Sequence, residues 1–201
     1  DSVKSRGLGD VYKRQEGIVH TYIHNDADPS MVEKLIINSK LRRPGICGAL
    51  ECLLINKSYY EIHGEKLIKK LINKGIEIRG DKIVSKINGV KLANHNDWGR
   101  EFLKKILAVK ITDDLQYAIN HINKYNSNHT DSIITENKRV AEQFFSEVDS
   151  AILMHNVSTQ FADGGEFGMG AEIGIGTGKL HARGPICLLY TSPSPRDFTE
   201  S

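Results

Sequence analysis

The sequence predicts an α/β fold in which helices flank a largely parallel β-sheet. Short apolar runs of the length expected for buried strands recur along the chain. Between them lie longer stretches whose apolar residues fall at helical spacing, with charged residues on the opposite face. Because strands that alternate with helices are joined by right-handed crossovers, most of the strands should run parallel.

The first part of the chain predicts a strand, a helix, a turn and a second strand. Val19 to Ile23 is a short β-prone run, and Asp28 with Pro29 then supplies an N-cap and a first-turn proline for the helix MVEKLIINSK. Arg42 to Gly48 is interrupted by proline and glycine, so it should form a turn. The apolar run Cys52 to Ile55 suits a buried strand that follows this turn.

The middle of the chain continues the alternation. Gly64 to Asn73 predicts an amphipathic helix, because its leucines and isoleucines fall on one face and its lysines on the other. Asp113 or Asp114 is placed to cap a second helix that runs to about Tyr125. The remaining elements expected are strands at Ile76 to Ile78, Leu107 to Ile111, Ser132 to Ile134 and Ala151 to Met154, and a helix at Glu136 to Glu147.

Composition indicates an ordinary globular protein with no charged partner surface. The 27 basic and 25 acidic residues are mixed along the sequence and leave a net charge of +2. The sequence therefore contains no stripe of basic residues that would indicate nucleic-acid binding. No apolar run approaches the roughly 18 to 20 residues of a membrane-spanning helix, and no secretory signal opens the chain. We therefore expect a cytoplasmic protein that binds neither nucleic acid nor membrane.

The two ends of the chain predict foreign segments. The peptides SRGLGDVYKRQ (Ser5 to Gln15) and CLLYTSPSPRD (Cys187 to Asp197) can be encoded by the two strands of one DNA element that resembles a transposase-type sequencing adaptor. Selection for a folded structure does not explain why two peptides at opposite ends of a chain should be encoded by the two strands of one DNA element, so these segments do not enter the fold prediction. We expect residues 1–15 and 187–201 to be translated adaptor, and residues 16–186 to be an internal piece of a longer protein.

Cys47 is the cysteine best placed for chemistry. It lies in the turn Arg42-Arg43-Pro44-Gly45-Ile46-Cys47-Gly48, where two nearby cations are expected to favour the thiolate, the nucleophilic form. The alternative is a small buried apolar residue, which is the usual role of such a cysteine. Cys52 lies inside an apolar run and is expected to belong to the core.

Other polar residues give weaker indications. The eight histidines include no H-x-x-x-H or H-E-x-x-H pair, so the sequence predicts no metal site. Asn156, Ser158 and Thr159 follow a predicted strand, and α/β proteins place ligand contacts beyond the carboxyl ends of strands. An ordinary polar turn is the alternative for these three residues. The segment from Gly164 to Gly184 is too rich in glycine for a regular helix.

Four segments, taken together, resemble gamma-glutamyl phosphate reductase (glutamate-5-semialdehyde dehydrogenase), a family of the aldehyde dehydrogenase superfamily. They occur in family order, and the glycine-rich stretch that ends in KLHARGP is the most specific of them. The resemblance implies the catalytic domain of an aldehyde dehydrogenase, with a largely parallel sheet and flanking helices. The four segments are Asn38 to Glu51, Leu107 to Ile133, Glu147 to Thr159 and Phe161 to Pro185.

The resemblance also implies a reaction. Gamma-glutamyl phosphate is reduced by NADPH to glutamate 5-semialdehyde with release of phosphate, a step of proline biosynthesis. Cys47 matches the nucleophile of the family, which forms a thioester that accepts hydride. Glu101 matches the region where the superfamily places a glutamate on the nicotinamide ribose, and a surface carboxylate is its alternative.

The resemblance covers only part of the family's chain. We therefore expect the cofactor-binding and oligomerisation parts to be incomplete, the full-length parent to be a homo-oligomer, and the fragment alone to be inactive. Two alternatives stay open: another oxidoreductase of the aldehyde dehydrogenase superfamily, or a non-catalytic assembly module in which Cys47 is structural.

Overall fold

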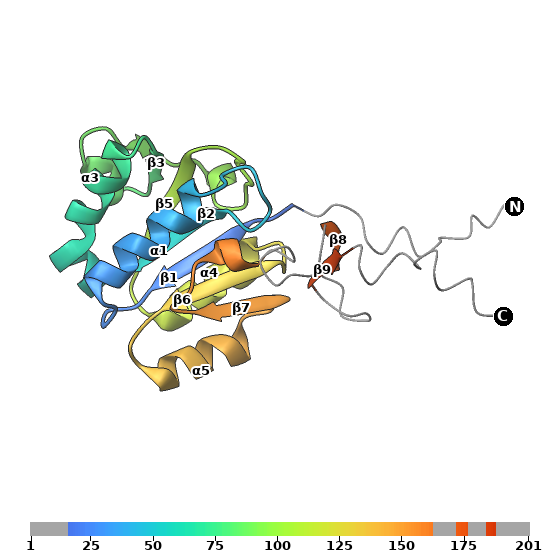
Figure 1. Cartoon of the computed structure of the whole chain (residues 1–201). Coiled ribbons are helices and arrows are strands. Elements are labelled where there is room, and N and C mark those ends of the chain that lie inside the picture. The colour runs from blue at the N-terminus through green and yellow to red at the C-terminus, as the bar shows by residue number, and fades with distance from the viewer. Residues whose placement is uncertain (1–15, 163–171, 177–183, 188–201) are drawn as a thin grey trace, which may run out of the picture.

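A seven-stranded parallel sheet forms the centre of the computed structural model, which describes residues 16–162, 172–176 and 184–187 (Figure 1). The strand order is β4-β3-β5-β2-β1-β6-β7, and every neighbouring pair runs parallel. The strands are β1 (Val19–Ile23), β2 (Leu50–Asn56), β3 (Glu77–Gly80), β4 (Lys91–Leu92), β5 (Ile106–Thr112), β6 (Thr130–Ile134) and β7 (Ile152–His155).

Helices cover both faces of the sheet, so the predicted α/β fold is confirmed. The helices α1 (Pro29–Leu41) and α3 (Glu65–Asn73) pack on one face, and α4 (Leu115–Tyr125) and α5 (Lys138–Glu147) pack on the other. A short helix α2 (Lys57–Tyr59) and a π-helical turn (Tyr60–Gly64) lead into α3. Short 3-10 turns lie at Val84–Lys86, His95–Asp97 and Thr159–Phe161.

The central strand β2 shows why these runs form a buried parallel sheet. Alternate side chains point to opposite faces of a strand, and both faces here are covered. Leu53 and Ile55 pack toward α1 and α3, whereas Cys52 and Leu54 pack toward α4. All seven residues of β2 are buried, which is why its centre, Cys52 to Ile55, is a continuous apolar run and not an alternating one.

Capping side chains fix where the main helices begin. Asp28 accepts a hydrogen bond from the Met31 N–H at 2.6 Å, which confirms the predicted start of α1. Of the two candidates for α4, Asp114 is the cap, since its carboxylate accepts from the Tyr117 N–H at 2.7 Å. The helix predicted from Gly64 begins earlier, because Asn56 at the end of β2 caps a first turn at Lys57.

The glycine-rich part of the chain contains two described strands. β8 (Glu172–Gly176) and β9 (Gly184–Cys187) pair antiparallel and form a separate two-stranded sheet. The strand β8 agrees with the expectation that no regular helix forms there. The two-residue strand β4 at the sheet edge is an element that the sequence did not predict. Within the described part of the chain, no helix is both long and apolar enough to cross a membrane.

Candidate functional site

Cys47 lies in the turn between α1 and β2, at the edge of the sheet where the parallel strands begin. Its side chain is partly exposed, whereas Cys52 is buried. Gly17, just before β1, packs directly on this turn: a Cβ on Gly17 would overlap the carbonyl group of Cys47. Only glycine allows the two backbones to approach so closely.

Glu101 reaches the same place from a third segment of the chain. Its Oε1 accepts a hydrogen bond from the Gly17 N–H at 2.8 Å. The structure therefore brings two residues singled out from the sequence, Cys47 and Glu101, into one neighbourhood through the backbone of Gly17. No sequence pattern predicts that Gly17 connects the two residues.

Ser158 and Thr159 pack against the last turns of α1, beside the Cys47 turn. The Ser158 hydroxyl donates to Asn38 Oδ1 at 2.7 Å, and the Thr159 N–H donates to Ser39 Oγ at 3.2 Å. The carbonyl oxygen of Thr159 would lie 3.0 Å from a Cβ on Gly48, so this segment touches the turn itself.

Gln160 is a site residue that the sequence did not suggest. Its side chain is fully buried, and its Nε2 donates to the carbonyl oxygens of Ser39 at 2.8 Å and Arg43 at 3.3 Å. It therefore joins the end of α1 to the turn that carries Cys47. The guanidinium group of Arg42 lies over the Phe161 ring, 5.9 Å from its centroid, and adds a second contact between the same segments.

Asn156 lies apart from this group. Its side chain donates to the Thr135 carbonyl at 3.0 Å and accepts from the Thr135 N–H at 3.1 Å, just beyond the carboxyl end of β6. That is the opposite end of the sheet from the Cys47 turn. The positive φ of 55° at Asn156 is one that asparagine tolerates better than most residues. The amide thus serves a strand end and is not directed at the thiol.

A buried ion pair, which no sequence pattern predicts, spans the Cys47 turn. Lys40 Nζ in α1 donates to Glu51 Oε2 in β2 at 2.6 Å, and both side chains are almost completely buried. The second oxygen of Glu51 accepts from the Leu103 N–H at 3.1 Å. Three segments are thereby joined: the end of α1, the start of β2 and the loop that carries Glu101.

Burial acts on both members of this pair. It raises the pKa of Glu51 to about 7, although Lys40 and the backbone N–H groups oppose the shift. It also lowers the pKa of Lys40, against the opposing effect of Glu51. Each charge is tolerated because the other is within hydrogen-bonding distance.

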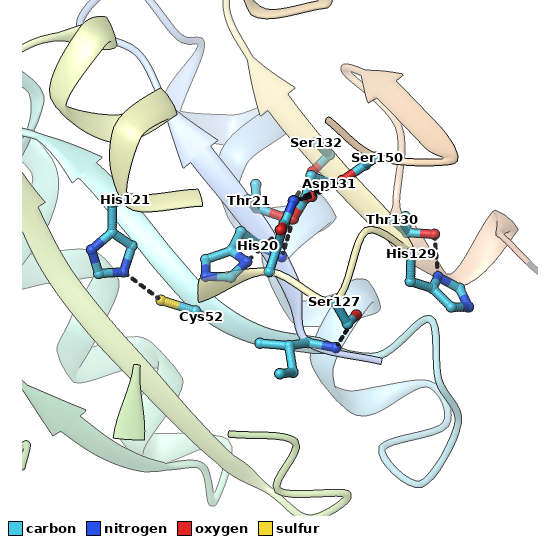
Figure 2. A network of polar contacts seen from close by, with 12 residues as sticks. His20, Thr21, Cys52, His121, Ser127, His129, Thr130, Asp131, Ser132 and Ser150 are labelled. Atoms are coloured by element: carbon cyan, nitrogen blue, oxygen red, sulfur yellow. Dashed lines mark hydrogen bonds and ion pairs between the residues drawn. The ribbon is translucent and has the colours of Figure 1, made fainter. Parts of the chain in front are cut away.

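Figure 2 shows a second polar network, which lies deeper in the sheet. The Asp131 carboxylate in β6 accepts from the backbone N–H of His20 at 2.9 Å and lies 3.2 Å from its Nδ1. Burial alone would lower the pKa of His20, but the Cys52 sulfur and the Asp131 carboxylate raise it to about 10. The two other buried histidines behave differently, because burial lowers the pKa of His121 to about 3 and that of His129 to about 4.

The architecture is that of an aldehyde dehydrogenase domain. A structure of an acetylating aldehyde dehydrogenase from Geobacillus thermoglucosidasius superposes with a TM-score of 0.62 at 19% identity, over 86% of this chain and 47% of that one. At this identity the match establishes the fold alone. No family model matches the chain.

Two proteins with higher sequence identity are both gamma-glutamyl phosphate reductases. The chain is 53% identical over 179 residues to a gamma-glutamyl phosphate reductase of Zymomonas mobilis. This alignment covers 89% of this chain and 42% of the relative. A crystal structure of gamma-glutamyl phosphate reductase from Thermotoga maritima superposes with a TM-score of 0.84 at 40% identity, over 89% of this chain and 43% of that one. The chain spans less than half the length of these relatives, and over that part it is similar to gamma-glutamyl phosphate reductases.

Lys40→Met should destabilise the fold by roughly 3 to 5 kcal/mol, because it leaves the Glu51 carboxylate buried without its partner. The measurement is urea unfolding followed by circular dichroism. Lys69→Met is the matched control: Lys69 pairs with Glu65 on the surface, where an ion pair contributes about 1 kcal/mol or less. Equal losses in the two variants would show that the buried pair does not hold these segments together.

His129 should make the fold less stable in mild acid. Its folded pKa of about 4 lies below the unfolded value of 6.5, so its contribution is complete above pH 6.5 and is lost as the pH falls toward 4. The full shift corresponds to roughly 3 kcal/mol. Unfolding free energies at pH 7 and pH 5 should differ less in His129→Gln than in the parent chain. The control His95→Gln alters an exposed histidine and should show the same difference between pH 7 and pH 5 as the parent chain. If the difference in His129→Gln also equals that of the parent, His129 is not the source of the pH dependence.

Proposed function

We propose that this chain is the cysteine-bearing part of an NADP-dependent gamma-glutamyl phosphate reductase, which converts gamma-glutamyl phosphate to glutamate 5-semialdehyde and phosphate in proline biosynthesis. The observation that carries the proposal is the place of Cys47. In a chain 53% identical to such a reductase, Cys47 lies partly exposed on a turn that is braced by three other segments, whereas Cys52, the other cysteine of residues 16–162, is buried.

The chemistry that we assign to this chain is acyl transfer. The Cys47 thiolate attacks the carbonyl carbon of the acyl phosphate, a carbon–sulfur bond forms, and the carbon–oxygen bond to phosphate breaks. Phosphate leaves with that electron pair, so a thioester remains on Cys47. Negative charge develops on the acyl oxygen during the attack, and we assign its stabilisation to backbone N–H groups of the turn.

NADPH, when bound, supplies the hydride that reduces the thioester to the aldehyde and returns Cys47 to the thiolate. Among the described residues, Glu101 is the candidate contact for this cofactor, and one of its carboxylate oxygens already accepts from Gly17. These residues do not form a nucleotide site by themselves. The chain spans 42% of the Zymomonas mobilis relative, so cofactor binding by the whole protein belongs to the proposal.

Ser158 and Thr159 are proposed to line the substrate side of the turn. Their position beside Gly48 supports this, as does the Thr159 hydroxyl, which is buried and makes no hydrogen bond within the described part of the chain. The sequence predicts Asn156 as a third contact of this kind, but its two hydrogen bonds to Thr135 favour a structural role. The proposal also includes a cytoplasmic homo-oligomer as the parent protein, with residues 1–15 and 187–201 as translated adaptor.

Iodoacetamide should alkylate Cys47 much faster than Cys52. The first thiol is partly exposed, whereas Cys52 is about 1% exposed and serves as an internal control in the same molecule. The rates are to be measured by mass spectrometry of the cysteine peptides after timed quenching of the native chain. Equal rates, or slower reaction at Cys47, would contradict a nucleophilic role.

A chimera should recover the whole reaction. In it, residues 16–162 replace the matching part of the Zymomonas mobilis relative, and phosphate release and NADPH oxidation are followed with gamma-glutamyl phosphate. Both signals are expected in the chimera, and Cys47→Ser should abolish both, because no thioester forms. If the chimera instead oxidises an aldehyde with the nicotinamide cofactor and releases no phosphate, the chain comes from a different oxidoreductase of the superfamily. Unchanged activity in Cys47→Ser would indicate that Cys47 is structural.

A further inference from the structure

Three potential metal ligands meet on the α4 face of the sheet. His20 comes from β1, Cys52 from β2 and His121 from α4, and one ligand atom of each lies within 4.8 Å of the other two. All three side chains are buried. Figure 2 shows Cys52 between the two imidazole rings, with its sulfur 3.9 Å from His121 Nε2.

One of these ligands has an unused nitrogen. His20 is fully buried, and its Nε2 makes no hydrogen bond within the described part of the chain. Leaving a buried polar atom without a partner is costly, so such atoms are uncommon unless something else binds them. A cation bound by Nε2 would remove this penalty.

The other nitrogen of His20 is oriented as it is in known metal centres. Metal-bound histidines usually donate their second ring N–H to a carboxylate, which fixes the ring and its tautomer. Here Nδ1 faces Asp131 Oδ1 at 3.2 Å, and the second oxygen of Asp131 accepts from Ser150 and from Asn126 Nδ2. The carboxylate is therefore held in place by other parts of the structure.

The donor set selects the kind of ion. One thiolate and two imidazoles suit soft cations, above all Zn²⁺ and Cu⁺, and do not suit Mg²⁺ or Ca²⁺. Bonds of about 2.3 Å to sulfur and about 2.0 Å to nitrogen place the ligand atoms roughly 3.5 Å apart. The 3.9 Å from sulfur to His121 Nε2 is close to that spacing, and small side-chain rotations would bring in the third ligand.

We propose that His20, Cys52 and His121 form a binding site for a soft cation, Zn²⁺ or Cu⁺, that joins β1, β2 and α4 in the core. The sequence predicts no metal site, because the three ligands come from separate elements and follow no motif spacing. The site is distinct from the Cys47 turn: Cys52 points to the α4 face, whereas the turn is braced by the end of α1 and residues 158–160.

The test uses the purified full chain after removal of metal by a chelator. Zn²⁺, Cu⁺ under reducing conditions and Co²⁺ are added separately, and bound metal is measured after gel filtration. We expect one ion per chain, together with a thiolate-to-cobalt charge-transfer band for Co²⁺. Cys52→Ser and His121→Gln should each weaken binding at least about ten-fold, the lower end of what even a supporting residue contributes.

Two control variants separate this site from other thiols and histidines. Cys47→Ser removes the thiol of the turn, and His129→Gln removes a buried histidine outside the cluster; both should bind metal as the parent chain does. Circular dichroism shows whether each variant is folded. If Cys52→Ser does not fold, the metal affinity of His121→Gln tests the proposal. No binding by the parent chain, binding unchanged in folded Cys52→Ser and His121→Gln, or binding lost in Cys47→Ser would overturn the proposal.

Discussion

The buried pair of Lys40 and Glu51 is the constraint on which the Cys47 turn depends. A turn rich in glycine, proline and arginine has little apolar surface of its own to hold it. The pair fixes both of its ends, and the Leu103 N–H bound to Glu51 attaches the loop of Glu101 to the same carboxylate. A buried ion pair is a poor source of stability compared with apolar packing, but it restricts geometry, because either charge left alone in the core is costly.

The parallel sheet determines which residues can meet at each end. Segments that precede strands gather at one edge, and Gly17, Cys47 and Glu101 come before β1, β2 and β5 respectively. The general expectation for α/β proteins, which places ligands beyond the carboxyl ends of strands, identified Asn156 at the other edge. Residues 158–160 reach the Cys47 turn because the chain after β7 packs on Asn38 and Ser39 near the end of α1.

Sequence reasoning predicted the fold well because the fold depends on local patterns. Apolar runs gave the long strands, and caps such as Asp28 gave helix starts; β4 was missed because two exposed residues carry no pattern. It also isolated Cys47 by the composition of its turn. It missed Lys40 with Glu51, and the His20 cluster, since partners brought together by tertiary packing leave no spacing along the chain. A lysine at the end of a helix looks solvent-exposed until the strand that faces it is known.

Gly17 has a consequence for how this protein can vary. Its N–H holds Glu101 and its Cα lies against the backbone of Cys47, so one residue without a side chain sets the separation of two functional groups. Inserting or deleting a single residue between Gly17 and β1 would put a side chain at that contact or shift the register of β1, and such a shift turns every side chain of the strand to the opposite face. Insertions and deletions should therefore be tolerated far less at this junction than in the surface loops. Libraries of variants should keep Gly17 and the number of residues between it and Val19.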